Sequence, residues 1–289
     1  MARLRDRIAE NVDGDFYVDH SCIDCDLCRQ IAPDVYARSA AKAQSYVQAQ
    51  PADPHRALMA LVACPTSSIG TTRKLDSKAA ARTFPEPLAD GVADVMFCGF
   101  ASEASFGAAA WLVRRRDGNV LIDSPRFAST LVERIAELGG VRWMFLTHRD
   151  DVADHRQYAK RFGCERVLHR ADVTRDTADV ERLIDGPIAL ADDLRIVPVP
   201  GHSRGSCVLI YRDTFAFTGD HVWASERDDA GGLEAGHEVS WYSWPEQKRS
   251  MAALAEHHFT WVLPGHGRRF HAASADAMRA ALLRLAATM

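Results

Sequence analysis

Residues 147–155 read Thr147-His148-Arg149-Asp150-Asp151-Val152-Ala153-Asp154-His155, directly after the apolar run 141–146. Histidine and aspartate recur after three later apolar runs, in Pro200-Gly201-His202-Ser203, Thr218-Gly219-Asp220 and Leu263-Pro264-Gly265-His266-Gly267. A rigid sheet can direct short side chains from strand-end loops at one point. The pattern therefore predicts a two-metal site. Its candidate ligands are His148, Asp150, Asp154, His155, His202, Asp220 and His266.

The composition sets bounds on fold and function. A chain of 289 residues with 47% hydrophobic content is long enough for one large domain with a core and one small domain. A formal charge of −4 without a long Lys/Arg run argues against a role on nucleic acids or membrane surfaces. The N-terminus lacks the apolar segment of a secretory signal, and no run has the length of a membrane span. We therefore expect a cytoplasmic protein that acts on a small-molecule substrate.

Four of the seven cysteines have the spacing of an iron–sulfur site. Cys22, Cys25 and Cys28 form a C-x2-C-x2-C segment, and Cys64 stands directly before Pro65. Three thiolates at this spacing wrap one face of a cubane cluster, and a remote cysteine supplies the fourth ligand. A structural zinc site is the alternative, but zinc knots usually draw on two separated pairs of ligands. We expect the other three cysteines to be buried core residues.

Around these cysteines, over residues 12–70, the chain resembles a single-cluster bacterial ferredoxin. The resemblance implies one [4Fe–4S] cluster, because Ala32-Pro33 stands where a two-cluster ferredoxin carries another cysteine. Segments 15–19 and 45–48 are expected to pair as short strands, and Asp53-Pro54 to begin a helix. A cluster that only holds the small domain together, without electron transfer, remains an alternative.

The chain is expected to be α+β, with a ferredoxin-like domain at 1–70, a polar linker at 71–94 and a larger domain at 95–289. Apolar runs predict eight strands in the larger domain, at 95–100, 108–113, 120–122, 141–146, 195–199, 207–211, 215–217 and 261–263. Helical patterns alternate with them, at 131–138, 151–162, 246–256 and 278–285. Layered sheets between helices are the natural packing for this order.

The histidine and aspartate segments, together with Asp123 after the apolar run 120–122, resemble the five motifs of the metallo-β-lactamase superfamily. The glyoxalase II and flavodiiron branches are the most similar, and the resemblance covers about residues 90–270. It implies an αββα sandwich with metals at one edge. It also implies two divalent ions, for which imidazole and carboxylate ligands suit zinc, iron or manganese.

The resemblance also implies a role for each ligand. Asp220 would bridge the two metals, and with Asp154 it would be a catalytic carboxylate. Asp123 would orient a ligand through hydrogen bonds. The first metal would take His148, Asp150 and His202, and the second would take Asp154, His155 and His266.

Two departures from the family pattern H-x-H-x-D-H put this arrangement in question. Asp150 replaces the second histidine, and two extra residues precede Asp154. We expect the loop to bulge so that both sites exist, although Asp151 could substitute for Asp150. In the alternative, a single metal is held by His148, His202 and Asp220, as in mononuclear iron oxygenases.

Two features near the predicted site allow two interpretations each. His221 could face the pocket or be an ordinary histidine. Segment 222–245 is aromatic, with Trp223, Trp241 and Gly231-Gly232, and could act as a lid or simply pack over the sheet.

Three functions are compatible with these predictions. A hydrolase would attack an ester, thioester or phosphoester with a metal-activated hydroxide, and we favour it slightly. An oxidoreductase would pass electrons from the cluster, supplied by a redox partner protein, to a mono- or di-iron site. A non-catalytic electron-transfer or sensor protein would use the larger domain only for binding. The fold alone cannot choose among them.

Overall fold

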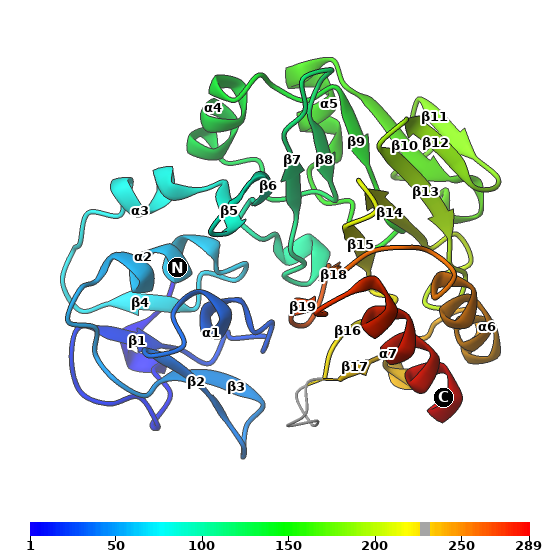
Figure 1. Ribbon diagram of the computed structural model, residues 1–289. Coiled ribbons are helices and arrows are strands. Elements are labelled where there is room, and N and C mark those ends of the chain that lie inside the picture. The colour runs from blue at the N-terminus through cyan, green and yellow to red at the C-terminus, as the bar shows by residue number, and fades with distance from the viewer. Residues whose placement is uncertain (226–231) are drawn as a thin grey trace. The chain divides into compact units, whose positions relative to one another are not determined.

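The computed structural model describes residues 1–225 and 232–289 (Figure 1), so Gly231 lies outside the described residues. The chain divides into two compact units. The first comprises Met1–Arg142 and Ala153–Phe162, and the second comprises Trp143–Val152 and Gly163–Met289. Among the described residues, no helix has the length and apolar character needed to cross a membrane.

The N-terminal part of the first unit contains two small antiparallel sheets and two helices. Strand β1 (Phe16–Val18) pairs with β4 (Ile69–Thr71), and β2 (Tyr36–Ser39) pairs with β3 (Gln44–Val47). Helix α1 (Leu27–Ile31) contains Cys28, the last cysteine of the C-x2-C-x2-C segment, and α2 (His55–Ala63) precedes Cys64. The Asp53 side chain accepts a hydrogen bond from the His55 N–H, as expected at a helix start.

The expected pairing of segment 15–19 with segment 45–48 is wrong, although both strands form. The Asn11 side chain lies between β1 and β3 instead. Its Oδ1 accepts hydrogen bonds from the backbone N–H groups of Val18 (3.1 Å) and Val47 (2.9 Å), and its Nδ2 donates to Ile8 and Val18 carbonyls. A side-chain amide thus satisfies backbone groups that a direct strand pair would satisfy.

The polar segment 71–94 contains secondary structure in addition to turns. Helix α3 (Lys78–Thr83) buries Ala80 and Ala81, and β5 (Glu86–Ala89) begins an antiparallel meander. Its remaining strands are β6 (Val92–Phe97), β7 (Trp111–Val113) and β8 (Val120–Ile122). Helices α4 (Ser129–Glu137) and α5 (His155–Phe162) complete this unit, with short 3-10 helices at Leu4–Asp6 and Glu103–Ser105. Small alanines and the polar edge strand explain why hydrophobic periodicity did not reveal α3 and β5.

The second unit begins with three parallel strands, β9 (Trp143–Phe145), β10 (Glu165–His169) and β11 (Arg182–Ile184). A six-stranded sheet follows in the order β12 (Ile188–Ala191), β13 (Leu194–Pro198), β14 (Cys207–Tyr211), β15 (Phe215–Gly219), β18 (Trp261–Pro264) and β19 (Phe270–His271). Strands β16 (Trp223–Ala224) and β17 (Leu233–Glu234) form a separate hairpin. The 3-10 helices of this unit are Arg170–Asp172 and His237–Val239.

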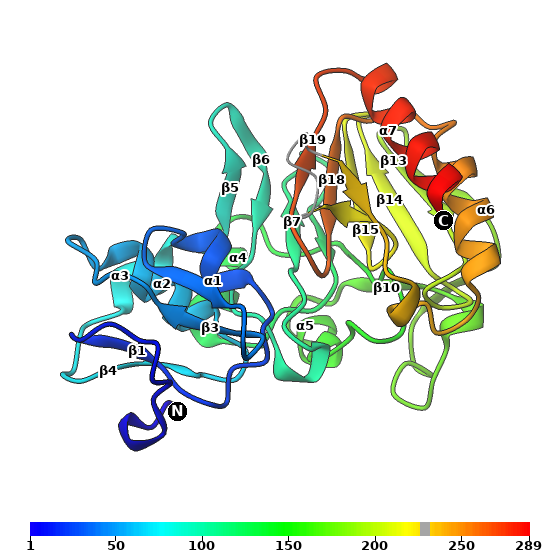
Figure 2. The ribbon, with the colours of Figure 1, turned by 90° about the horizontal axis from the view of Figure 1, so that it is seen from below.

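Helices α6 (Trp244–Leu254) and α7 (Ala275–Thr288) cover one face of the six-stranded sheet (Figure 2). Met251 and Leu282 belong to the same buried cluster as Val208 and Val262 of the sheet. Burial of each such side chain stabilises the fold by about 1.5–3 kcal/mol. All five residues of β14 are buried, so this sheet is an inner layer, as the expected α+β class requires.

Candidate metal centres

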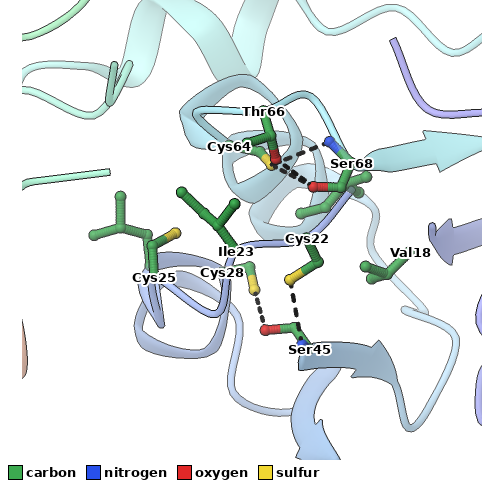
Figure 3. A pocket seen from close by; sticks show the side chains of 11 residues that line it. Val18, Cys22, Ile23, Cys25, Cys28, Ser45, Cys64, Thr66 and Ser68 are labelled. Carbon is green, nitrogen blue, oxygen red and sulfur yellow. Dashed lines mark hydrogen bonds between the residues drawn. The ribbon is translucent and has the colours of Figure 1, made fainter. Parts of the chain in front are cut away.

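The four predicted cluster ligands line one pocket of the first unit (Figure 3). Cys22, Cys25 and Cys28 come from the loop before α1 and its first turn, and Cys64 ends α2. Asp24 and Asp26 adopt left-handed backbone conformations, with φ of 60° and 66°, which turn the loop back on itself between the cysteines. The chain thus brings together four thiols that are distant in sequence.

Backbone and hydroxyl groups surround these sulfurs. The Ser45 N–H donates to Cys22 Sγ at 3.4 Å, and the Ser68 N–H donates to Cys64 Sγ at 3.3 Å. Cys28 Sγ and Ser45 Oγ lie 3.2 Å apart. Hydrogen bonds to sulfur are one means by which proteins set the potential of an iron–sulfur cluster. The donor set therefore fits a [4Fe–4S] cluster.

The environment of the cysteines is strongly desolvated. Burial raises the pKa of the Cys25 thiol to about 12, so its thiolate would need a nearby positive centre, such as iron. Arg29 is buried close by and forms ion pairs with Asp24 and Asp26. Its guanidinium also donates to Ser45 Oγ at 2.6 Å, which fixes the hydroxyl next to Cys28.

Six candidate ligands of the larger domain lie in the second unit. His148 follows β9, and its Nδ1 lies 2.9 Å from Thr147 Oγ1. This contact directs Nε2 toward two carboxylates, at 3.8 Å from Asp220 Oδ2 and 3.9 Å from Asp151 Oδ2. Burial lowers the pKa of His148 to about 4, against the opposing attraction of Asp220. The ring is therefore neutral, as a metal ligand must be.

His202 follows β13 and is held in one orientation. Its Nδ1 donates to the Val239 carbonyl at 2.7 Å, so Nε2 carries the lone pair of the neutral ring. Nε2 lies 3.4 Å from Asp150 Oδ2 and 3.8 Å from Asp220 Oδ2. Burial lowers the pKa of His202, but the Asp150 and Asp220 carboxylates outweigh burial and raise it.

Asp220 and His266 complete the cluster of donors. His266 Nδ1 lies 2.9 Å from both Asp220 carboxylate oxygens and 3.9 Å from Asp151 Oδ2. Burial disfavours the Asp220 anion, but His266, His148 and His202 together hold its pKa well below the usual range. Gly219, with φ of 50°, places its Cα where a Cβ would lie 2.6 Å from Thr147 Oγ1. Only glycine allows the Asp220 and His148 loops to approach this closely.

These donors form two overlapping groups, one of His148, Asp150 and His202 and one of His148, Asp151 and Asp220. Within each group the ligand atoms all lie within 4.8 Å of one another. Two ligands of a tetrahedral ion at a bond length of about 2.1 Å are about 3.4 Å apart. The observed separations of 3.4–3.9 Å therefore need only a small inward shift to close on a cation.

The sequence pattern left open whether Asp150 or Asp151 is the metal ligand. Asp151 was expected only as a substitute for Asp150, but both aspartates face the donor cluster. Asp151 is fully buried, whereas the Asp150 side chain is 34% exposed. A buried carboxylate next to histidines is rare and marks a functional site, but the burial of Asp151 is visible only in the structure.

Asp172 was missed by the sequence prediction. It is buried at the end of the short 3-10 helix after β10, and it joins two ligand loops. Its Oδ2 accepts from the Arg149 N–H at 3.1 Å and from the Ser203 hydroxyl, and its Oδ1 accepts from the Gly205 N–H at 2.7 Å. Asp172 therefore orients the loops that carry His148 and His202.

Asp123, Asp154 and His155 belong to the first unit, and their predicted roles at the metals stay predictions. Asp123 is buried with φ of 56° at the end of β8, and His155 is buried at the first turn of α5. Asp154 directly precedes α5. Its carboxylate accepts from the Phe127 N–H at 2.8 Å and from Gln157 Nε2 at 2.6 Å. Ala153, with φ of 22°, bends the chain before it.

Two further side chains lie close to the ligands. His221 is fully buried, and within residues 1–225 and 232–289 neither of its ring nitrogens has a hydrogen-bond partner. Burial, then the neighbouring His202, lowers its pKa to about 3. Trp241 is 63% exposed, and its ring centroid lies 6.5 Å from that of His202. The predicted aromatic segment thus reaches the ligands at Trp241, while Trp223 lies in β16.

Known proteins match the chain in two separate comparisons, one with a protein family and one with a curated enzyme. Residues 18–71 match the family described as the 4Fe-4S single cluster domain of Ferredoxin I, which confirms the predicted module over these residues. Hydroxyacylglutathione hydrolase of Acidiphilium cryptum (strain JF-5) is 29% identical over 127 residues. That match covers 40% of this chain and 49% of the relative, so the chain matches about half the length of that enzyme.

Solved structures are similar at lower identity. DIM-1 metallo-beta-lactamase has a TM-score of 0.49 at 16% identity, with 66% of this chain and 94% of that chain covered. TTHA1623 in a di-iron-bound form has a TM-score of 0.46 at 20% identity, with 57% of this chain and 89% of that chain covered. Neither value establishes a function. The chain thus matches a single-cluster 4Fe-4S ferredoxin family over residues 18–71 and is similar, over 127 residues, to a hydroxyacylglutathione hydrolase.

Proposed function

We propose that this chain is a metal-dependent hydrolase of esters, with thioesters as the preferred class, that also carries a [4Fe–4S] cluster. The convergence of six imidazole and carboxylate donors in the second unit carries the proposal. The similarity to a hydroxyacylglutathione hydrolase favours a thioester over a phosphoester. In this function the cluster is structural or regulatory.

The residues of the second unit have separate tasks in the proposed reaction. The Nε2 atoms of His148 and His202 and the Asp220 carboxylate would hold a divalent ion. When bound, such an ion lowers the pKa of a coordinated water toward neutrality and polarises the substrate carbonyl. Asp150 is partly exposed, lies 3.4 Å from His202 Nε2 through its Oδ2, and can accept a proton. The exposed Trp241 ring beside His202 would pack against an apolar part of the substrate and exclude water.

An oxidoreductase is the second candidate. The two neighbouring carboxylates Asp150 and Asp151 favour it, because anionic oxygen ligands shift metal preference from zinc toward iron or manganese. The cluster module would then receive electrons from a redox partner protein. Both candidates use the same donors and differ in the metal that they hold.

Anaerobic purification followed by metal analysis separates the two candidates. Iron and sulfide belonging to the cluster are quantified first, and the remaining zinc, iron and manganese are assigned to the second unit. Hydrolysis of a hydroxyacylglutathione thioester is then measured for the native protein, the chelated protein and the protein restored with zinc or iron. We expect hydrolysis that depends on the restored metal.

The variants His202→Ala and His258→Ala give a matched pair for this assay. His258 is exposed and belongs to neither donor group, so its substitution should leave hydrolysis unchanged. His202→Ala should reduce metal content and hydrolysis together. Equal hydrolysis by both variants would exclude the proposed site. Full iron content with no hydrolysis, and with cluster-dependent oxidation of a reductant, would favour the oxidoreductase.

A further inference from the structure

Loop 123–128, between β8 and α4, contacts the end of helix α2. Arg126 Nη2 donates to the Val62 carbonyl at 2.9 Å, and its guanidinium lies 5.8 Å from the centroid of the Phe100 ring. Val62 stands in the last turn of α2, two residues before the cluster ligand Cys64. Helix ends leave carbonyl groups without partners inside the helix, and a cation there also interacts favourably with the helix dipole.

The same loop contacts helix α5 on its other side. Tyr158 Oη donates to the Arg126 carbonyl at 3.1 Å, and the Tyr158 ring is fully buried against Phe127 at a centroid distance of 5.1 Å. The Phe127 N–H donates to Asp154 Oδ2 at 2.8 Å. These contacts set the position of the residue that precedes α5 and of its first two turns.

A backbone path runs parallel to the Arg126 side chain. The Ala101 N–H donates to the Ala63 carbonyl at 3.2 Å, and the Arg126 N–H donates to the Phe100 carbonyl at 2.8 Å. The end of α2 is therefore held by the Ala101 backbone and by the Arg126 side chain, and the Arg126 backbone holds Phe100, the residue before Ala101. All of these residues belong to one compact unit.

We propose that Arg126 is a positioning residue that makes the start of α5 depend on the cluster-binding module. Cys64 is the C-terminal cap of α2, so its attachment to a cluster fixes the helix end whose carbonyls Arg126 and Ala101 hold. Release of Cys64 loosens this end, and the loosening passes through Arg126 to Tyr158 and Asp154. The consequence for catalysis rests on the proposed function and on the predicted role of Asp154 and His155 as metal ligands. The link from Cys64 through Arg126 to α5 does not depend on these roles.

Amide hydrogen exchange of the whole protein tests the link. In the native protein, the cluster is removed with an iron chelator and an oxidant. The loosened end of α2 then loses the charge-assisted hydrogen bond between Arg126 and the Val62 carbonyl, so amide exchange in residues 155–162 should become about 10-fold faster or more. In Arg126→Gln with its cluster in place, exchange there should already be faster, and chelation should add less than in the native protein, because only the backbone path through Phe100 remains. Unchanged α5 exchange after cluster removal from the native protein would overturn the proposal.

Two further variants keep the test decisive if Arg126→Gln loses its cluster. Tyr158→Phe removes the Tyr158 hydroxyl contact on the α5 side only, so α5 exchange should rise while the cluster absorbance is unchanged. Arg142→Gln is the matched control, because Arg142 also donates to a carbonyl of the same unit, that of Asp117, at 2.6 Å. Equal α5 exchange in the Tyr158 variant and the control would refute a link through Arg126. This outcome is independent of hydrolysis, so it also separates the link from the proposed function.

Discussion

Gly265→Ala is expected to weaken metal binding in the second unit without unfolding the chain. Gly265 precedes His266, and a Cβ at this position would lie 2.8 Å from Asp151 Oδ2 and 3.1 Å from Asp220 Oδ1. An ordinary contact begins at 3.4 Å, so the methyl group intrudes on Asp151 by about 0.6 Å and on Asp220 by about 0.3 Å. Asp151 is fully buried and the Asp220 side chain is only 13% exposed, which leaves little room for either to move aside.

The size of the effect follows from coordination geometry. Metal–ligand distances tolerate deviations of about 0.2 Å, so displacement of one or two carboxylates by several tenths of an ångström should misplace them. Changes that only misorient ligands typically cost about 10–100-fold in metal affinity. We expect a loss in this range for zinc, which corresponds to about 1.4–2.8 kcal/mol.

Competitive titration with a chromophoric chelator measures this affinity, and thermal unfolding without metal checks the fold. Gly186→Ala is the matched control, because a Cβ at Gly186 meets no atom within 4 Å and the residue lies in the same unit. The control should bind zinc as the native protein does. If Gly265→Ala also binds zinc with native affinity while it remains folded, Asp151 and Asp220 do not hold the metal.

The remaining predictions concern other ligands and their supports. Cys64→Ser should lose or degrade the cluster, so the anaerobic protein should carry far fewer than about four irons per module, measured by iron and sulfide analysis; an unchanged brown colour contradicts the assignment. Asp220→Ala should release metal from the whole second-unit site, whereas Asp123→Ala should lower affinity more modestly, and equal zinc retention by both would exclude a bridging role. Asp172→Asn should lower the free energy of unfolding by about 1–3 kcal/mol, because an amide NH2 would then face a backbone N–H donor in a buried site. Urea unfolding measures this loss, and the exposed Asp176→Asn is its control.

The strand-end positions of the donors could be predicted because apolar runs locate strands, and loops that follow neighbouring strands lie at one edge. His148, His202, Asp220 and His266 are brought together in this way. The choice between Asp150 and Asp151 depends on loop geometry, which residue spacing does not determine. Both face the donors, whereas the sequence analysis expected either Asp150 or Asp151 in their place.

Asp172 could not be predicted because its segment resembles an ordinary polar surface turn. Its importance arises from contacts with Arg149 and Gly205, which are distant in sequence. Strand pairing in the small module failed for a related reason. Periodicity locates a strand but not its partner, and the Asn11 amide satisfies the groups that a direct pairing of β1 with β3 would have used.

The glycine at position 107 limits which cysteine loop can pack against its segment. A Cβ there would lie 2.7 Å from the Cβ of Cys25 and 3.2 Å from its sulfur, and Gly107 also has a φ of 87°. The segment after β6 is therefore shaped to fit against this particular cysteine loop. A ferredoxin module whose cysteine loop had another shape would not fit against this surface, so exchanging the module would require changes around Gly107 as well.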